Sequence, residues 1–292
     1  MRSRVVPMKQ RYALGIDIGG SGIKGAIVDL RKGEFATDRL RIPTPQPATP
    51  EAVAAVVKQI ADHFAAELGD GPIGITVPAV VTHGRTRSAA NIDPAWVDAP
   101  AEDIFREALG RPITLVNDAD AAGIAEVLWG AAKDHPGLVM VTTLGTGIGT
   151  AMIHKGTLVP NIELGHIEMF GKDAEPQAAA SVKDREELSY ETWATERLQP
   201  YYERLEFYTW PDLIVVGGGV SKASDKFLPL LKLKTPIVPA KLRNAAGIVG
   251  AAWLAVDALA NPDALRGGEG PAEAAAKGKE KDKKSKKDKK KD

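Results

Sequence analysis

The sequence predicts an α/β protein, because strand-like and helix-like segments alternate along most of its 292 residues. Residues 12–18 and 23–30 alternate apolar with small or polar side chains on either side of a glycine cluster, which predicts a β-hairpin. Residues 51–68 carry apolar side chains at helical spacing. Thr49 and Pro50 precede them as a cap and a first-turn residue, so a helix is expected there.

The remaining elements continue this alternation. Strand-like runs lie at residues 73–77, 113–116, 139–144 and 213–216. A helical pattern covers residues 118–129, between two of these runs. The last helical segment, residues 244–259, is apolar around most of its circumference, so we expect it to pack against other elements on both sides.

The chain is long enough for two modest domains, because single hydrophobic cores stop growing at about 250 to 300 residues. We expect an N-terminal α/β lobe at residues 12–112 and a C-terminal α/β lobe at residues 113–243. Residues 1–11 form an N-terminal extension, residues 244–260 a helix that packs back between the lobes, and residues 261–292 a disordered, lysine-rich tail.

Composition narrows the class of protein. Hydrophobic residues make up 44% and charged residues 26% of the chain, which is typical of a globular protein. No apolar run reaches membrane-spanning length, and the basic start lacks an apolar stretch of signal-peptide length. Without cysteine the chain has no disulfide, no thiolate nucleophile and no cysteine-ligated zinc. We therefore expect a soluble, cytoplasmic protein.

The formal net charge of zero hides an asymmetry. Between Lys277 and Asp292 there are ten lysines and four acidic residues, so this segment carries +6 and the rest of the chain carries −6. A segment without apolar anchors cannot bury enough surface to become ordered. We interpret it as a solvated tail, and attraction of a polyanion is the alternative.

The first glycine cluster predicts an anion-binding turn. Gly20, Gly22 and Gly25 match a dinucleotide-binding spacing, but a β-branched run that is too short for the required helix follows them. The tip of the hairpin consists instead of Gly19, Gly20, Ser21 and Gly22. Its backbone N–H groups can approach an anion without obstruction, and Lys24 adds positive charge.

Two further glycine clusters follow. Residues 142–150 also join two strand-like runs and lack the lysine of a P-loop, which predicts a second turn of this kind around Gly145, Thr146 and Gly147. Residues 215–221 lead from a strand into a helical segment, and Gly218 and Gly219 there are candidates for covering the far end of a phosphate chain. A single glycine cluster is usually an ordinary turn, but three in this order favour phosphate binding.

In this order the loops resemble those of the actin, hexokinase and Hsp70 superfamily, in which each of two lobes brings one β-hairpin to the phosphates. The resemblance implies a two-domain actin-like ATPase (ribonuclease H-like) fold with a cleft between the lobes. More narrowly, the chain resembles the repressor, open reading frame and kinase (ROK) family of sugar kinases. The matching motifs are Asp17-Ile18-Gly19-Gly20, Val116-Asn117-Asp118, Leu144-Gly145-Thr146-Gly147-Ile148-Gly149 and Glu163-Leu164-Gly165-His166.

The resemblance covers residues 12–260 and is greatest to the polyphosphate-dependent glucokinases of that family, through residues 158–166 and the block from 171–175 through 236–240. It implies transfer of a phosphoryl group from inorganic polyphosphate, with ATP as a second donor, to the 6-hydroxyl of glucose. It also implies a Mg²⁺ ion and a homodimer. Two departures from the wider family are the missing cysteine zinc site and Asn161 at a position usually held by glycine.

The resemblance assigns roles to two aspartates. Asp118 matches the catalytic base that takes the proton of the sugar hydroxyl, and it follows a predicted buried strand. The alternative for Asp118 is a helix N-cap. Asp17 matches the carboxylate that meets Mg²⁺ directly or through water. The alternative for Asp17 is a side chain that stabilises its own turn.

Five residues are candidates for binding the sugar. Asn91 and Asn117 could each bridge two hydroxyls, because an amide both donates and accepts hydrogen bonds. Glu163, His166 and Glu175 match sugar contacts of the family. For His166 the alternative is a buried structural histidine. Half of a di-iron site is disfavoured, because Gly165 interrupts the helix that a Glu-x-x-His pair needs.

Three other functions remain open. One is a hexokinase of the same family that uses only ATP. Another is a sugar-responsive repressor, but about eleven residues before the first strand are too few for a helix-turn-helix. The third is a non-catalytic sugar sensor, which has no need for the base Asp118. We therefore expect glucose and a phosphoryl donor as partners, and neither nucleic acid nor a membrane.

Overall fold

The computed structural model describes residues 10–89, 92–261 and 265. Its first sheet has the order β3-β2-β1-β5-β8, with β4 also paired to β2. These strands are β1 (Tyr12–Gly19), β2 (Gly22–Asp29), β3 (Glu34–Phe35), β4 (Leu40–Ile42), β5 (Ile73–Val77) and β8 (Thr114–Asn117). β1 and β2 form an antiparallel hairpin, whereas β1, β5 and β8 run parallel.

The second sheet has the order β11-β10-β9-β14-β15. Its strands are β9 (Leu138–Leu144), β10 (Ile148–His154), β11 (Thr157–Val159), β14 (Leu213–Gly217) and β15 (Ile237–Pro239). β9 and β10 form a second antiparallel hairpin, and β9, β14 and β15 run parallel. Two small ribbons pair β6 (Val81–Thr82) with β7 (Arg85–Thr86), and β12 (Glu168–Met169) with β13 (Lys172–Asp173).

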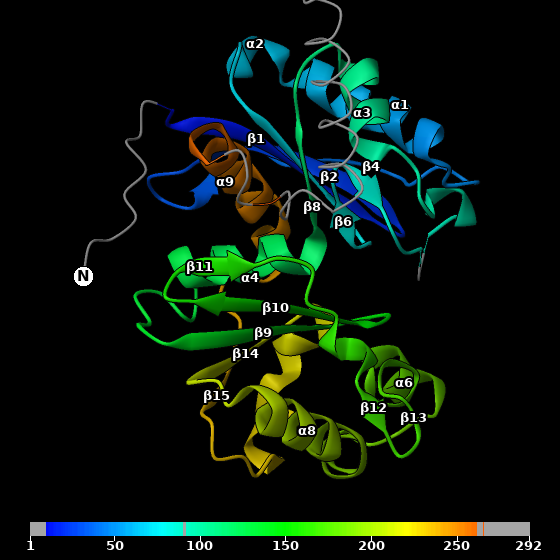
Figure 1. The fold of residues 1–292 in the computed structure, drawn as a ribbon, viewed down its shortest axis with the longest axis vertical. Coiled ribbons are helices and arrows are strands. Elements are labelled where there is room, and N and C mark those ends of the chain that lie inside the picture. Colours follow the sequence, from blue (N-terminus) through cyan, green and yellow to red (C-terminus); the bar gives the residue numbers. More distant parts are fainter. Residues whose placement is uncertain (1–9, 90–91, 262–264, 266–292) are drawn as a thin grey trace, which may run out of the picture.

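Helices separate and cover the two sheets (Figure 1). The α-helices are α1 (Pro50–His63), α2 (Ala65–Leu68), α3 (Ala101–Leu109), α4 (Asp118–Leu128), α5 (Glu175–Ala178), α6 (Ala180–Arg185), α7 (Tyr190–Thr192), α8 (Gln199–Thr209) and α9 (Ala246–Ala260). A π-helical stretch covers Trp193–Leu198, and 3₁₀ turns cover Pro94–Trp96, Leu164–His166, Gly219–Lys226, Leu228–Leu230 and Arg243–Ala245. α4 and α9 lie between the sheets, α1 and α3 lie on the far side of the first sheet, and α8 lies on the far side of the second.

Glycines let α9 lie directly on the backbone of its neighbours. A Cβ added at Gly15 of β1 or at Gly74 of β5 would stand 1.9 Å from a carbonyl oxygen of α9. At Gly250 of α9 an added Cβ would stand 1.8 Å from the carbonyl oxygen of Ala121 in α4. Such approaches exclude any side chain at these positions. α9 therefore fixes the first sheet and α4 relative to each other.

Two large apolar cores lie on the outer faces of the sheets. One packs α1 and α3 on the first sheet and encloses the fully buried Trp96 and Phe105. The other packs α8 on the second sheet and encloses Trp193 and Tyr202. Burying a large apolar side chain contributes about 1.5 to 3 kcal/mol each, so both sheets are rigid supports for the loops at their ends.

Most predicted elements are confirmed. The β1–β2 hairpin forms, and the predicted strands lie within two residues of their expected bounds. Thr49 caps α1 by accepting a hydrogen bond from the N–H of Ala52. The helix expected over residues 51–68 is interrupted at Phe64, and the third glycine cluster leads into a 3₁₀ turn.

Some expectations concern parts of the chain outside the described residues, namely the extension before residue 10 and most of the lysine-rich tail. The domain boundaries stay a prediction. None of the helices within the described ranges is both long and apolar enough to cross a membrane.

Candidate functional site

A cavity of about 570 Å³ lies where the ends of both sheets and the start of α4 meet. It brings together most of the residues that the sequence singled out. From the glycine turns these are Gly19, Gly20, Gly145, Thr146, Gly147 and Gly218, and the candidate sugar, base and metal residues are Asp17, Asn117, Asp118, Glu163, His166 and Glu175. Ser21, Gly22 and Gly219 do not line it, Lys24 lines an adjoining cavity, and Asn91 lies outside the described residues.

The first glycine turn joins β1 to β2 and is held from β4 and the segment after it. The hydroxyl of Thr44 donates to the carbonyl of Gly19 at 2.5 Å, and the guanidinium of Arg41 donates to the carbonyl of Ser21 at 2.7 Å. Arg41 is also the cross-strand partner of Lys24. Like charges on directly opposed strand positions destabilise a strand pair, and here the Asp17 carboxylate lies 3.6 Å from the Lys24 ammonium. The turn therefore presents two cations beside its backbone N–H groups.

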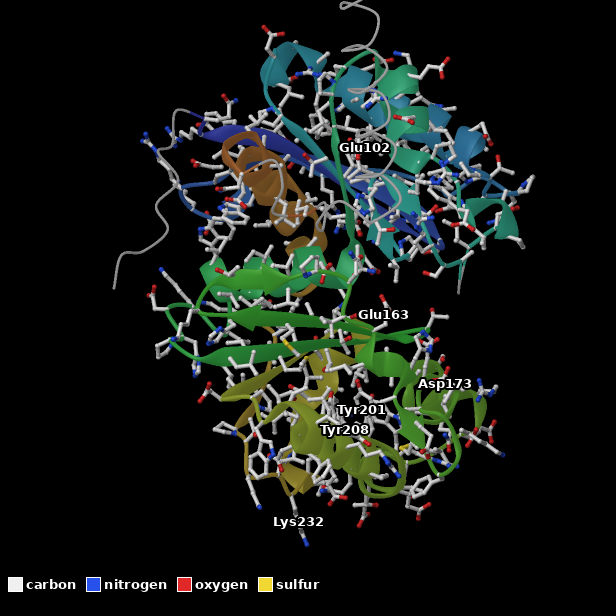
Figure 2. The ribbon with its side chains drawn as sticks, in the orientation of Figure 1. Glu102, Glu163, Asp173, Tyr201, Tyr208 and Lys232 are labelled. Atoms are coloured by element: carbon white, nitrogen blue, oxygen red, sulfur yellow. The ribbon has the colours of Figure 1, made fainter. Side chains whose placement is uncertain are left out.

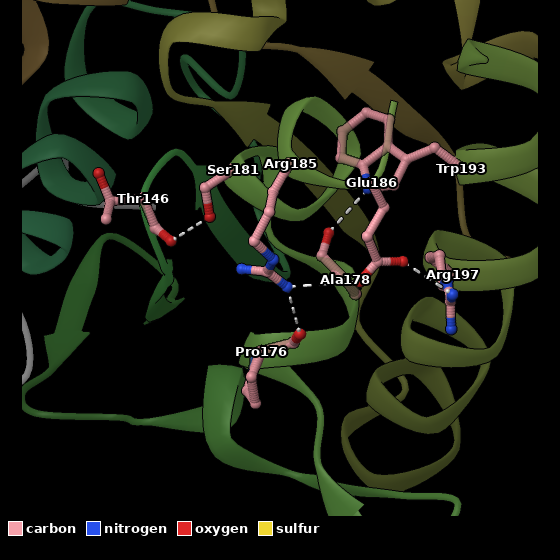
Figure 3. Close-up of polar contacts among 8 residues, drawn as sticks. All are labelled: Thr146, Pro176, Ala178, Ser181, Arg185, Glu186, Trp193 and Arg197. Carbon is pink, nitrogen blue, oxygen red and sulfur yellow. Dashed lines mark hydrogen bonds and ion pairs between the residues drawn. The ribbon is translucent and has the colours of Figure 1, made fainter. Parts of the chain in front are cut away.

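The second glycine turn joins β9 to β10 and is fastened to α6. The N–H of Gly145 donates to the carbonyl of Gly147 across the turn at 3.0 Å. Ser181 of α6 donates its N–H to the carbonyl of Gly145 and its hydroxyl to the carbonyl of Thr146 (Figure 3). The figure also shows Trp193, which donates its ring N–H to Ala178 and so ties this helical block to the core behind it.

Glu175 supports the same turn from the cavity side. One of its carboxylate oxygens accepts a hydrogen bond from the N–H of Ile148 at 2.8 Å. A Cβ added at Gly147 would lie 2.2 Å from that oxygen, so any larger residue there would displace the Glu175 carboxylate. Glu175 thus has one oxygen engaged with the protein, and among the described residues no hydrogen-bond donor engages its other oxygen.

Asp118 lies at the junction of β8 and α4, but it does not cap the helix. Asn117 is the N-cap, because its side-chain oxygen accepts from the N–H groups of Ala119 and Asp120. The alternative interpretation of Asp118 as the cap is therefore wrong. Desolvation, and secondarily the charge of Asp17, raises the pKa of Asp118 to about 7. A carboxylate with such a pKa is suited to exchange a proton near neutral pH.

The cap has a consequence for Asn117 itself. Its amide oxygen already accepts two hydrogen bonds, and its amide nitrogen donates to the carbonyl of Ala79 at 3.2 Å. Among the described residues, one N–H of the amide therefore remains for a ligand, rather than the donor and acceptor pair that the sequence suggested.

Asp17 is held at the end of β1. Its carboxylate accepts a hydrogen bond from the hydroxyl of Thr76 at 2.9 Å and lies 3.6 Å from the ammonium of Lys24. Within the described ranges no three His, Asp or Glu side chains gather as a metal cluster. A Mg²⁺ ion that shares phosphate oxygens and water needs only one or two protein carboxylates. The carboxylate of Asp17, which faces the cavity beside the two glycine turns, fits such an ion.

Glu163 and His166 approach the cavity from the loop after β11. Figure 2 shows Glu163 at the side of the second sheet that faces the first, with Asp173 farther out. Partial desolvation, and then the charge of Glu175, raises the pKa of Glu163. Desolvation lowers the pKa of His166, but its 2.8 Å hydrogen bond to Asp173 and nearby carboxylates outweigh this, so the pKa is raised. Asp173 thereby orients the imidazole.

Comparison with known proteins places this site in a family. The ROK family model matches residues 13–180. The polyphosphate glucokinase of Mycobacterium tuberculosis is 51% identical over 248 residues, which cover 85% of this chain and 92% of that protein. The chain belongs to the ROK family.

Other relatives support the assignment to the ROK family. The polyphosphate glucokinase of Mycobacterium leprae is 49% identical over 82% of this chain and 72% of that protein. The crystal structure of inorganic polyphosphate/ATP-glucomannokinase from Arthrobacter sp. strain KM is 48% identical, covers 86% of this chain and all of that chain, and superposes with a TM-score of 0.81. The ROK glucokinase of Streptomyces griseus, at 24% identity and a TM-score of 0.69, shares the fold. The chain has the two-domain actin-like ATPase fold of ROK kinases.

Sequence reasoning missed a polar connection next to the sugar residues of this ROK chain. Asp120, buried in the first turn of α4, accepts a hydrogen bond from the N–H of Asn161 at 2.8 Å. Desolvation raises the pKa of Asp120 to about 7. The side-chain amide of Asn161 in turn pairs with both backbone groups of Val81. No local sequence signal links positions 41 and 80 residues apart.

Arg41 was also missed, because nothing in its local sequence distinguishes it from an exposed strand residue. Asn161, by contrast, was noticeable in the sequence, because it stands at a position usually held by glycine. Its φ of 60° is a left-handed conformation that asparagine tolerates better than most residues, which is why it can replace glycine in this loop.

Proposed function

We propose that this protein is a polyphosphate glucokinase, which transfers the terminal phosphoryl group of inorganic polyphosphate, or of ATP, to the 6-hydroxyl of glucose. The observation that carries the proposal is the position of Asp118. It lies in one cavity with the two glycine turns and with the candidate sugar residues Glu163 and His166. The relatives named polyphosphate glucokinase, at about half identity over most of the chain, support the donor and acceptor.

Asp118 is the proposed general base. Phosphoryl transfer depends mainly on positioning and charge neutralisation, and a carboxylate takes the hydroxyl proton as the new bond forms. A base with a pKa of about 7 is matched to the physiological range. Because Asn117 performs the capping of α4, the carboxylate of Asp118 is not needed for it.

The glycine turns are proposed to bind the phosphoryl group while it is transferred from the donor to the sugar. Gly19, Gly20, Ser21 and Gly22 of the first turn, with Lys24, would bind it from one sheet, and Gly145, Thr146 and Gly147 of the second turn from the other. Gly218 and Gly219 would close the side nearer the rest of the donor. Backbone N–H groups are suited to this role because they are fixed before the reaction begins.

A divalent cation belongs to the proposal, and Mg²⁺ is its expected identity. Asp17 is the residue that would hold it together with donor phosphates and water. When bound, the ion neutralises charge on the donor phosphates. The hydroxyl of Thr76 orients Asp17 through a hydrogen bond to its carboxylate.

The sugar is proposed to lie against Asn117, Glu163, His166 and Glu175. Each lines the cavity and has at least one polar atom that no described contact fully uses. Asn91 remains a proposed contact on sequence grounds alone. A cytoplasmic location and a homodimer are likewise proposed, the first because a cysteine-free chain suits a reducing compartment.

A coupled assay for glucose 6-phosphate tests the proposal directly. The purified full-length protein is supplied with glucose and either polyphosphate, ATP or no donor. We expect turnover with polyphosphate, with or without turnover with ATP. Turnover with ATP alone identifies an ATP-dependent hexokinase, and absence of turnover with both donors, together with retained glucose binding, identifies a sugar-sensing regulator.

A further inference from the structure

A second cavity, of about 150 Å³, adjoins the main one on the side away from the sugar residues. Asp17 and Asp118 line both cavities, so the second opens where the transferred phosphoryl group is proposed to sit. Its other polar walls are Lys24 of β2, Glu126 of α4, Thr143 of β9, and Arg243 and Asn244 of the turn before α9.

Arg243 has an unusual backbone. Its φ is 52°, a left-handed conformation that costs free energy for a bulky residue and that glycine adopts freely. Such strain persists where the surrounding structure imposes it, and it is concentrated at functional sites. The side chain is exposed, and no carboxylate within the described ranges forms an ion pair with it. Its charge is therefore available to an anion.

The turn before α9 is held by hydrogen bonds to Glu126, a residue of α4. Glu126 is almost fully buried, with 1% of its surface exposed. One carboxylate oxygen accepts from the N–H groups of Ala131 and Lys241, and the other accepts from the N–H of Leu242 at 2.7 Å. A buried carboxylate with several backbone donors is held firmly. Because α4 also begins with Asp118, the turn and the candidate base share one rigid support.

The start of α9 adds to this environment. Ala245 occupies the N-cap position and offers no side-chain acceptor, so the first N–H groups of the helix lack a side-chain cap. Gly247 lies in the same wall, and a Cβ added there would stand 3.1 Å from a carboxylate oxygen of Asp17. Beside the carboxylates of Asp17, Asp118 and Glu126, the cavity therefore has two side-chain cations and a helix end that favours negative charge.

We propose that Arg243 binds the phosphates of inorganic polyphosphate that follow the transferred one, and that Glu126 positions Arg243 for this by anchoring residues 241 and 242. This inference rests on the proposed function. Polyphosphate carries no base, so its affinity depends on charge and N–H donors along the chain. The planar fork of arginine suits bidentate contact with phosphate. ATP has an adenosine group for additional contacts and depends less on Arg243.

The principal test is Arg243→Gly in the full-length protein. Glycine removes the guanidinium and relieves the left-handed strain at once, so binding and stability are expected to move in opposite directions. We expect the KM for polyphosphate to rise about tenfold or more, because a charged hydrogen bond to phosphate is lost. The KM for glucose is expected to stay unchanged, the KM for ATP to rise less than about threefold, and Tm not to fall.

The matched control is Lys155→Gly. Lys155 has a φ of 52° and an exposed, positively charged side chain, but it lies in the turn between β10 and β11 and lines neither cavity. The same loss of charge and the same relief of strain there are expected to leave all KM values unchanged. Binding of fluorescently labelled polyphosphate without glucose, at fixed salt, gives a second readout for both variants that does not depend on turnover.

Glu126→Gln tests the positioning role. The amide places N–H groups against backbone N–H groups, so the turn before α9 loses part of its anchor. We expect Glu126→Gln to raise the KM for polyphosphate and to leave kcat unchanged. In the Arg243→Gly background, adding Glu126→Gln is expected to cause no further rise in that KM. A fall in kcat with an unchanged KM would assign Glu126 to supporting Asp118 and overturn its role for Arg243.

The outcomes separate this inference from the proposed function. If the unaltered protein shows no turnover with polyphosphate, the proposed function is wrong and the inference is wrong with it. If the unaltered protein uses polyphosphate and Arg243→Gly binds it equally well, only the inference is wrong. An equal rise in KM for ATP, or a Tm several degrees below that of the unaltered protein, also overturns it.

Discussion

Asn161 forms two hydrogen bonds with the backbone of Val81 through its side-chain amide, a pair of contacts that we call the clasp. The amide oxygen accepts from the N–H of Val81 at 2.9 Å, and the amide nitrogen donates to the carbonyl of Val81 at 2.8 Å. Asn161 belongs to the loop that carries Glu163 and His166, whereas Val81 follows β5 of the first sheet. The backbone N–H of Asn161 donates to the buried Asp120. The loop after β11 of the second sheet is thereby fixed to β6, which follows β5 of the first sheet, beside the proposed sugar site.

The clasp predicts the effect of Asn161→Gly. Glycine accepts the φ of 60° without strain but loses both hydrogen bonds to Val81, each of which contributes about 1 kcal/mol. We expect the KM for glucose to rise about tenfold, because the loop with Glu163 and His166 is no longer held. Steady-state kinetics with glucose as the varied substrate measures this. Glu187→Gly, at an exposed residue that also has a positive φ, serves as control, and equal glucose KM values in both variants would refute the role.

Asp118→Asn is expected to abolish turnover and to preserve glucose binding. The amide keeps the shape of the side chain and can still accept from the N–H of Ala119, but it cannot take a proton. Loss of a general base lowers kcat by about 10² to 10⁴. Calorimetric titration with glucose, alongside the coupled assay, separates binding from catalysis. Retained turnover would remove Asp118 from the mechanism.

The raised pKa of Asp120 predicts how stability depends on pH. Its carboxyl has a pKa of about 7 in the folded protein and an ordinary value of 3.8, so between these values the folded state binds more protons than the unfolded state. The free energy of unfolding therefore falls as pH rises from about 4 to 7. Asp120→Asn removes this loss, because the amide stays neutral and can still accept from the N–H of Asn161.

Thermal melts of both proteins across this range provide the measurement. We expect the Tm of Asp120→Asn minus that of the unaltered protein to increase with pH, at about 2 to 4 °C for each kcal/mol. A Tm difference between Asp120→Asn and the unaltered protein that stays constant from about pH 5 to pH 8 would show that Asp120 does not titrate in that interval.

Removal of residues 277–292 tests the interpretation of the lysine-rich tail, which lies outside the described residues. We expect the KM for long-chain polyphosphate to change by less than about tenfold at moderate salt, because exposed charges are screened over about 10 Å. A larger rise would instead assign the tail to capture of the donor. Repeating the assay at low salt separates nonspecific attraction, which grows as salt falls, from a specific site.

The sequence was informative where the relevant physics is local. The β1–β2 hairpin follows from period-two alternation around Gly19–Gly22, and the junction at Asp118 follows from a buried strand that meets a helix. Thr49 was recognisable as a cap because capping acts within three residues. These features needed no knowledge of the rest of the chain.

Long-range contacts were not accessible in this way. The bonds from Glu126 to Lys241 and Leu242 join positions 115 and 116 residues apart, and the clasp of Asn161 on Val81 joins positions 80 apart. Asn117 and Asp118 were both assigned to the ligand, but only the structure shows which of the two caps α4. A cap can be satisfied by either of two neighbouring polar side chains, and packing decides between them.

The sequence alone determined the α/β alternation, the glycine turns and the family, because each depends on residue types at short spacing. Only the tertiary structure decided which polar groups are already used by the protein and which remain for ligands. That allocation depends on burial and on partners distant in the chain, because a buried polar group must find its hydrogen bonds wherever the fold brings a partner. The exposed Arg243 and the buried Glu126 differ in this respect although both are merely charged residues in the sequence.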